Sequence, residues 1–362
     1  MRLGVGAALV GGSLVLGDVE VAGGRITGVG LSSPNGNGVA APGFVDLQVN
    51  GYAGVDFFCA DADGYRRAGD ALLERGVTSY QPTFITSPEE ELVAALREVP
   101  QNGSSPRIIG AHLEGPFISA ERLGTHPAAS RRDPDGALLE RLLDAGPVSH
   151  VTLAPELPGA GELMELLRKR GVTVSCGHSN ATAAEAREAF ARGAKTVTHI
   201  FNAMRPFAAR EPGLAGAALF SPDVVVQVIL DGVHLADDTA RLVWQAAAGR
   251  VALVTDALAA AGAGDGAYTI AGVALDVENG VSRRADGVLG GSTVPMIDAV
   301  RNLVELGAPL DAALSAASTV PARIAGRPEL GTLEPGGAAD VVVLDDNLEI
   351  SRVLVAGNEA VS

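Results

Sequence analysis

The chain has 362 residues, of which 47% are apolar and 19% charged, so it can bury a large core, and its length suggests about two domains. Its net charge of −16 argues against binding to nucleic acid or to an anionic membrane surface. No stretch offers the ~20 consecutive apolar residues of a membrane span. The two cysteines, Cys59 and Cys176, have no paired spacing, which fits a reducing, cytoplasmic setting.

Both ends of the chain carry the signals of short β-strands. Residues 14–30 alternate apolar with small or polar side chains around Gly23-Gly24, which is typical of an antiparallel hairpin. The segments ADVVVLD and SRVLVAGNEAV near the C-terminus have the same character. We expect residues 1–41 and 331–362 to form one small β-sandwich domain, with 31–41 leading into the main domain.

Between these ends, apolar runs alternate with helical patterns. Strands with intervening helices favour a (β/α)8 TIM-type barrel over residues 42–330, with a β insertion near residues 265–290. Helices are expected at 65–75, 89–99, 162–170, 183–192 and 237–247. The eight expected strands are 43–49, 78–82, 107–113, 150–154, 172–176, 196–200, 224–230 and 251–255.

Reactive side chains follow several of these strands, at the barrel end where catalytic groups lie in such enzymes. His178 and His199 are 21 residues apart, at equivalent ends of a strand–helix–strand unit, so they can share one ligand. Glu114 follows the third strand. Two imidazoles and one carboxylate suit a divalent metal ion with an open position for water. Zn²⁺ is favoured, and Fe²⁺, Co²⁺ and Mn²⁺ are alternatives.

A metal ion in such a site acidifies a water molecule and polarises a carbonyl group. A nearby carboxylate must then carry the proton of the water to the leaving group. Asp256, at the end of the eighth strand, is the candidate for this role. The alternative for Asp256 is a helix cap or turn, and the alternative for each histidine is an ordinary polar residue at a strand end.

Several longer motifs support a specific resemblance. In chain order they are PGFVDLQVNGYAGVDF, HLEGPF, GHSNAT, THIFNAM, REPGLAG, DGVHL, VTDA and LGTLEPGGAADVVVLD. From about Pro42 to the C-terminus, the sequence resembles N-acetylglucosamine-6-phosphate deacetylases of the amidohydrolase superfamily. The resemblance implies hydrolysis of the acetamide of N-acetylglucosamine 6-phosphate to glucosamine 6-phosphate and acetate. It also implies one metal ion per subunit on Glu114, His178 and His199, and Asp256 as proton acceptor and donor.

The resemblance further implies which residues meet the phosphorylated amino sugar. His126 is expected to help polarise the acetyl carbonyl, and the turn at residues 289–291 to form a wall of the sugar pocket. A homodimer is implied, with the phosphate contacts near its interface and Arg210 acting across it. The expected contacts on the sugar side are Thr125, His126, Leu289, Gly290 and Gly291, and those to phosphate and hydroxyl groups are Asn202, Ala203, Arg210 and His234.

One position departs from the superfamily. Many amidohydrolases carry His-x-His at the end of the first strand, which supplies a second metal site, but this chain has Gln48 and Asn50 there. Amides are poor metal ligands, so a single-metal site is expected. Gln48 and Asn50 are instead expected to hydrogen-bond water or substrate near the metal.

Three competing interpretations remain. Gly177-His178-Ser179 resembles part of a serine nucleophile elbow but lacks the second glycine. The same metal site could act on another N-acetyl sugar phosphate or on a cyclic amide. A non-catalytic protein on the same barrel is the third, and it is disfavoured because every expected ligand and Asp256 are present.

Overall fold

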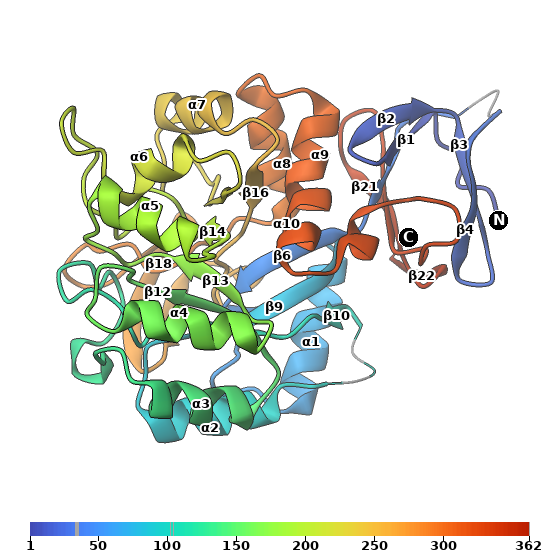
Figure 1. Ribbon diagram of the computed structural model, residues 1–362. Coiled ribbons are helices and arrows are strands. Elements are labelled where there is room, and N and C mark those ends of the chain that lie inside the picture. Colours follow the sequence, from blue (N-terminus) through green and yellow to red (C-terminus); the bar gives the residue numbers. More distant parts are fainter. Residues whose placement is uncertain (33–35, 102, 104, 362) are drawn as a thin grey trace.

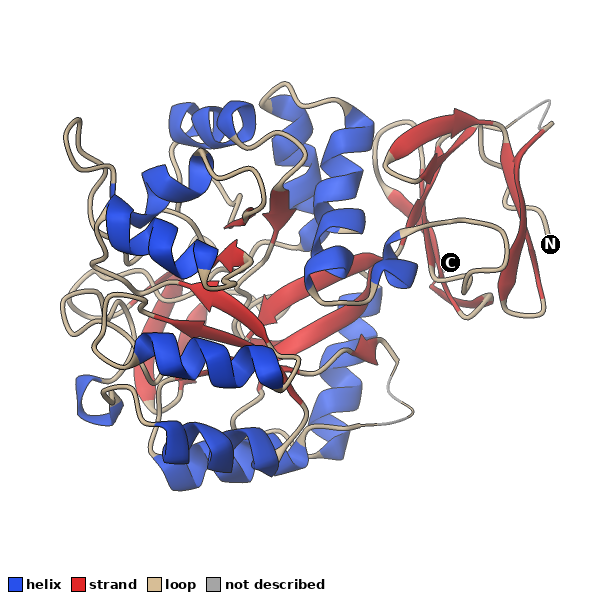
Figure 2. Cartoon of the chain, in the orientation of Figure 1, coloured by secondary structure: helices blue, strands red, loops and turns tan. Residues whose placement is uncertain are grey.

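The computed structural model describes residues 1–32, 36–101, 103 and 105–361, and a nearly closed barrel of parallel strands lies at its centre (Figures 1 and 2). Neighbouring strands pair in parallel all the way from the first to the eighth. The predicted (β/α)8 barrel is therefore confirmed. In order around the barrel, the strands are β6 (Phe44–Val49), β9 (Val77–Ile85), β11 (Ala111–Glu114), β12 (Val148–Leu153), β13 (Thr173–Cys176), β14 (Thr196–Val197), β15 (Val225–Val228) and β16 (Val251–Leu253).

The seam between the first and last strands is closed in an unusual way. Among the described residues, the connection is a parallel bridge of Val49 with Ala257 rather than a ladder of β6 with β16. The buried carboxylate of Asp46 accepts hydrogen bonds from Thr255 Oγ1 at 2.6 Å and from the Thr255 backbone N–H at 3.2 Å. The side chain of Asp46 thus links β6 to the segment that follows β16, where a continuous backbone ladder is absent among the described residues.

Helices surround the barrel, and most of them bury one stripe of apolar side chains against the strands, whereas all seven residues of α6 are buried. In α4, for example, the buried Ala160, Leu163, Met164 and Leu167 recur at helical spacing. Helix α5 begins with a capping box formed by Thr182 and Glu185. The helices are α1 (Ala62–Leu73), α2 (Glu89–Glu98), α3 (Gly136–Ala145), α4 (Ala160–Lys169), α5 (Ala183–Ala191), α6 (Gly213–Leu219), α7 (Asp237–Ala246), α8 (Met296–Glu305), α9 (Leu310–Ala317) and α10 (Thr319–Ile324).

The two ends of the chain meet in a β structure beside the barrel (Figure 1). A two-stranded sheet of β3 (Asp18–Ala22) and β4 (Arg25–Leu31) packs on a six-stranded sheet through an apolar core that includes Val19, Ile26 and Val341. The six-stranded sheet has the order β2 (Ser13–Leu16), β1 (Ala7–Val10), β5 (Val39–Pro42), β20 (Val341–Leu344), β21 (Ile350–Val355) and β22 (Asn358–Val361).

Segment 31–41, which was expected to lead into the barrel, is not a connecting loop throughout. Residues 39–42 form the central strand β5, which pairs with β1 and β20, and residues 33–35 lie outside the described residues, as does residue 362. A four-residue apolar run is too short to show a strand period, so its role depends on the neighbours that bury it.

A three-stranded antiparallel sheet follows the eighth barrel strand. It consists of β17 (Gly266–Ile270), β18 (Val273–Glu278) and β19 (Val281–Arg283). Its inner face packs on residues at the barrel mouth, where Ile85 and Leu258 join Ile270, Leu275 and Val277 in one apolar cluster. Shorter strands occur at β7 (Gly51–Tyr52), β8 (Val55–Asp56) and β10 (Arg107–Ile108).

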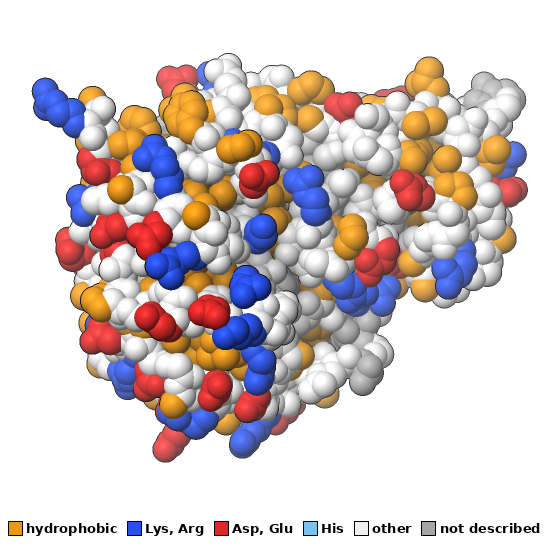
Figure 3. All heavy atoms as spheres, viewed as in Figure 1, with side chains coloured by type: hydrophobic (Ala, Val, Ile, Leu, Met, Phe, Trp, Pro, Cys, Tyr) orange, Lys and Arg blue, Asp and Glu red, His pale blue; other side chains and the backbone are white. Residues whose placement is uncertain are grey.

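Two features concern nucleic acid and membranes as partners: the distribution of charge on the surface and the length of the helices. On the face drawn in Figure 3, acidic and basic side chains are interspersed rather than gathered into a basic patch. In the described part of the chain, every helix is too short or too polar to cross a bilayer.

Candidate active site

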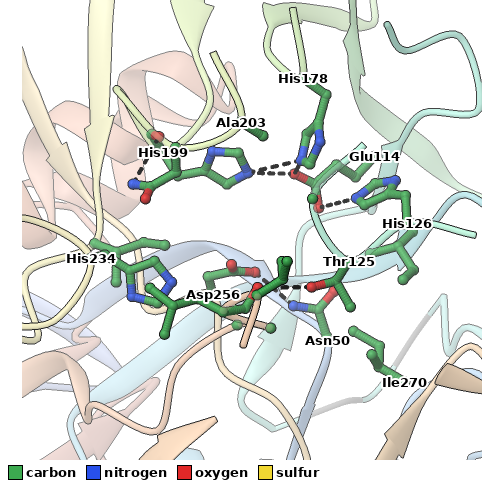
Figure 4. A pocket seen from close by; sticks show the side chains of 18 residues that line it. Asn50, Glu114, Thr125, His126, His178, His199, Ala203, His234, Asp256 and Ile270 are labelled. Carbon is green, nitrogen blue, oxygen red and sulfur yellow. Dashed lines mark hydrogen bonds and ion pairs between the residues drawn. The ribbon is translucent and has the colours of Figure 1, made fainter. Parts of the chain in front are cut away.

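Three buried ligand-type side chains converge at the C-terminal end of the barrel (Figure 4). Glu114 Oε1 lies 2.8 Å from His199 Nε2 and 3.1 Å from His178 Nε2. The two Nε2 atoms are 3.2 Å apart. Burial alone would raise the pKa of Glu114, but the neighbouring histidines outweigh burial and hold it well below its usual range. One carboxylate and two imidazoles thus face a common point, as the ligands of a divalent cation do.

The surroundings of the histidines fit metal binding. His178 Nδ1 lies 2.9 Å from the backbone carbonyl oxygen of Arg122, and a carbonyl can only accept, so Nδ1 carries the proton. The lone pair of Nε2 is therefore free to bind a cation, which is the usual arrangement around a ligating histidine. His199 Nδ1 is buried and has no hydrogen-bond partner among the described residues.

Several residues of the site have a left-handed backbone. His178, His199, Ala203 and Asp256 have φ values of +47°, +28°, +48° and +50°, a region that non-glycine residues seldom adopt. All four line the same cavity. Such backbone strain is concentrated where side chains must be aimed at a functional site, and here it turns each chain segment away from its strand direction at the barrel rim.

His126 lies beside the cluster on a loop that follows β11. Its Nδ1 is 2.8 Å from Thr86 Oγ1 and 3.4 Å from the Thr86 backbone nitrogen, and its Nε2 is 3.7 Å from Glu114 Oε2. Burial is the main reason that the pKa of His126 is lowered to about 4. Since the Thr86 N–H donates to Nδ1, the neutral ring carries its proton on Nε2, from which it can donate to an oxygen atom in the cavity.

Asp256 is held by two amides, one in the first strand and one directly after it. Gln48 Nε2 and Asn50 Nδ2 donate to Asp256 Oδ1 at 3.0 Å and 2.8 Å, while no described residue donates to Oδ2. Gln48 Nε2 also lies 3.2 Å from Glu114 Oε2. Burial, and next the charge of Glu114, raise the pKa of Asp256 to about 6. The carboxylate is therefore oriented by two donors to Oδ1, and Oδ2 remains available for proton transfer.

These groups line a cavity of about 200 Å³. Thr125 Oγ1 donates to the carbonyl of Leu289 at 2.8 Å, which ties the loop of His126 to the turn after β19. A Cβ atom on Gly290 would lie 2.6 Å from Leu275 Cδ2 and 3.2 Å from Thr125 Oγ1, so any larger residue here would have to displace the end of the Leu275 side chain. The expected residues on the wall are Asn50, Glu114, Thr125, His126, His178, His199, Asn202, Ala203, His234, Asp256, Leu289, Gly290 and Gly291.

Two expected site residues lie elsewhere. Gln48 is buried behind the wall and reaches the site through its hydrogen bonds. Arg210 is exposed on the loop that precedes α6 and does not line the cavity. Within this chain, therefore, the cavity wall contains no lysine or arginine among the described residues.

Sequence reasoning missed other residues of the site. Asp231 accepts from His234 Nδ1 at 2.7 Å and from the His234 backbone N–H at 2.8 Å, which orients that ring, and its position three residues before His234 was a usable signal. Ile85 ends the second strand, and residues at the C-terminal ends of barrel strands line the active site, so the reasoning that found Glu114 could also have found Ile85. Ile270 carries no local signal, because only packing brings β17 to the barrel mouth. The cavity is also lined by Gly124, Ile229 and Val288.

The serine alternative finds no support in the geometry. Ser179 Oγ donates to Glu156 Oε2 at 2.7 Å and accepts from the Ala181 N–H at 3.0 Å. Ser179 is fully buried and does not line the cavity. Its hydroxyl stabilises the turn after β13.

The barrel, the Glu–His–His cluster and the adjacent carboxylate define a metal-dependent hydrolase. The sequence profile of the amidohydrolase family matches residues 39–360, and the chain belongs to this family. It is 37% identical to an N-acetylglucosamine-6-phosphate deacetylase of Mus musculus over 96% of this chain and 92% of that protein. An N-acetylgalactosamine-6-phosphate deacetylase of Escherichia coli O157:H7 is 36% identical, over 88% of this chain and 87% of that protein.

The solved structures agree with the sequence comparison. A mutant N-acetyl-D-glucosamine-6-phosphate deacetylase of Mycobacterium smegmatis, in complex with N-acetyl-D-glucosamine-6-phosphate, superposes with a TM-score of 0.94. The two chains are 36% identical, with 99% of this chain and 98% of that one covered. The predicted resemblance to this group of deacetylases and the predicted hydrolase class are confirmed.

Proposed function

We propose that this protein hydrolyses the acetamide of N-acetyl-D-glucosamine 6-phosphate to D-glucosamine 6-phosphate and acetate. The observation that carries the proposal is the position of Asp256 in the same cavity as the Glu114–His178–His199 cluster. Amide hydrolysis needs both an electrophile for the carbonyl and a group that moves a proton to the leaving amine. The names of the relatives supply the substrate.

Glu114, His178 and His199 would hold one divalent ion per subunit, which when bound polarises the amide carbonyl and acidifies water. Two nitrogen ligands and one carboxylate favour Zn²⁺, with Fe²⁺, Co²⁺ and Mn²⁺ as alternatives. Gln48 and Asn50 occupy the two positions at which many amidohydrolases carry the histidines of a second metal site. Their amides donate to Asp256, which supports a single-metal site.

Asp256 is proposed to move the proton. Its Oδ1 is occupied by the amides of Gln48 and Asn50, so Oδ2 takes a proton from the attacking water. Oδ2 then gives this proton to the amine nitrogen as the C–N bond breaks. His126, with its proton on Nε2, is proposed to donate to the carbonyl oxygen as negative charge develops there.

The remaining residues are proposed to bind the sugar phosphate. Thr125 and the turn at Leu289–Gly291 contact the sugar, while Asn202, Ala203 and His234 contact the phosphate and hydroxyl groups. Because Arg210 is exposed outside the cavity of its own chain, we assign it to the phosphate site of the partner subunit in a homodimer. A cytoplasmic location, and a division into a β domain (1–41 and 331–362) and a barrel domain (42–330), complete the proposal.

The test is acetate release by the purified, metal-loaded protein. We expect turnover of N-acetylglucosamine 6-phosphate, none of unphosphorylated N-acetylglucosamine, and loss of activity with a chelator. Turnover of a cyclic amide in place of the phosphorylated sugar would refute the proposal. N-Acetylgalactosamine 6-phosphate is the second candidate substrate, because a relative that bears its name is 36% identical, and it belongs in the same assay.

A further inference from the structure

Two parts of the cavity wall differ in chemistry. One part has the amide of Asn202, the backbone at Ala203 and the ring of His234. Another part of the wall is apolar and includes Ile85, Ile270 and Val288. Ile270 lies across the cavity from His234, and the Glu114–His178–His199 cluster lies along the side of the cavity next to Ala203 (Figure 4).

The two isoleucines come from different parts of the chain but form one surface. Ile85 ends β9 and is the direct register partner of Glu114 in β11. Ile270 ends β17, just before a turn in which Ala271 and Gly272 have φ values of +48° and +75°. Both side chains belong to the apolar cluster at the barrel mouth, where they are only 3% and 5% exposed. The wall is therefore close-packed on its far side and cannot yield without disturbing that cluster.

The geometry of an amide decides which part of the substrate meets this wall. A secondary amide is planar and trans, so the acyl carbon chain and the sugar carbon on nitrogen lie on opposite sides of the C–N bond. With the sugar and its phosphate at the polar part of the wall and the carbonyl carbon at the metal cluster, the acyl methyl group points toward the apolar part. We propose that Ile85 and Ile270 form an acyl pocket that limits the leaving acyl group to acetyl.

This inference rests on the proposed function and deepens it, because it names the acyl group that the site accepts. One additional methylene against a close-packed wall must displace Ile85, Ile270 or the cluster behind them. Hydrophobic pockets discriminate by about 10- to 200-fold for each methylene, so N-propionyl glucosamine 6-phosphate should be a poor substrate of the unmodified enzyme.

The experiment compares kcat/KM for the N-formyl, N-acetyl, N-propionyl and N-butyryl derivatives of glucosamine 6-phosphate. In Ile270→Ala and Ile85→Ala, the propionyl-to-acetyl ratio should rise about tenfold. Ile270→Phe should instead favour the formyl substrate. Val243→Ala is the matched control, since Val243 is buried on α7 but neither belongs to this cluster nor lines the cavity, and its ratio should stay that of the wild type. Thermal unfolding of each variant checks that it folds.

The possible failures are distinct. A wild-type enzyme that releases no acetate refutes the proposed function together with this inference. A wild-type enzyme that is active, with a propionyl-to-acetyl ratio that is unchanged in the folded variants, refutes the acyl pocket alone. If an alanine variant does not fold, Ile85→Val and Ile270→Val remove a single carbon each, and the ratio must still rise about threefold to support the proposal.

Discussion

The side-chain amide of Asn50 donates to Oδ1 of Asp256 over 2.8 Å, which joins the first and last strands of the barrel at the mouth of the cavity. Gln48 donates to the same oxygen. In this chain the first strand therefore contributes neutral donors that orient a carboxylate. Asp256 can turn little, and its second oxygen has no described protein donor. This arrangement sets the first prediction.

Replacing Asp256 with Asn should abolish proton transfer while leaving the metal ligands in place. We expect kcat to fall by about 10²- to 10⁴-fold, with wild-type metal content by elemental analysis. Asn50→Ala, which removes one of two donors to Oδ1, should have a smaller effect on kcat. Near-normal activity in Asp256→Asn would show that another group carries the proton.

Replacing Glu114 with Ala should remove the metal itself. The carboxylate contacts both imidazoles, so without it two neutral ligands remain, and such a pair should bind a divalent ion far more weakly. We expect about one ion per chain in the wild type and almost none in the variant after dialysis. Glu140→Ala, an exposed position on α3, is the control and should keep its ion. A full metal content in Glu114→Ala would contradict the assigned ligand set.

If Arg210 acts across a dimer interface, two impaired variants should complement each other when activity is measured at a substrate concentration far below the raised KM. Arg210→Ala should raise KM for the phosphorylated sugar, while Asp256→Asn is inactive. In mixed dimers of these two variants, one site receives both an intact Arg210 and an intact Asp256. Random exchange of subunits should therefore restore about a quarter of the wild-type activity.

The control for that mixture replaces Arg241 with Ala. Arg241 pairs with Asp238 within α7 and should have no effect on KM. If the mixture is no more active than its components although dimers form, Arg210 does not serve the neighbouring site.

Asp46 should make the stability of the fold depend on pH. Burial, opposed by its hydrogen bonds with Thr255 and Gln48, raises the pKa of Asp46 to about 7, against ~3.9 in the unfolded chain. The folded protein thus binds a proton between these values that the unfolded chain releases. This contribution to stability is fully present below about pH 4 and is lost as pH rises to about 7, with a magnitude of up to about 4 kcal/mol.

The variant Asp46→Asn tests this dependence, because it cannot titrate. The difference in Tm between variant and wild type should move in favour of the variant from pH 5 to pH 8. Other buried carboxyl groups, such as Asp56, titrate in both proteins and largely cancel in the difference. A Tm difference that is the same at both pH values would mean that Asp46 is already ionised in the folded protein at pH 5.

The pattern of the sequence predicted the barrel and most of its rim correctly, because apolar runs and the polar residues that end them are local features. Two details differ. The expected strand at 107–113 is interrupted, since Gly110 has a φ of +98°, outside the extended region, and β10 ends before β11 begins. The expected strand at 196–200 has only two paired residues, because His199 leaves the extended conformation to face Glu114.

The sequence alone determined which reactive groups follow which strands, because strand period, helix spacing and the residues at strand ends can be read within one segment. It therefore predicted Glu114, His178, His199 and Asp256 as one set. Only the tertiary structure decided that Asn50 would hold Asp256, that Arg210 would lie outside the cavity of its own chain, and that Ile270 would face the barrel mouth. These relationships join segments far apart in the chain, and they are fixed by packing across the barrel, which no local pattern encodes.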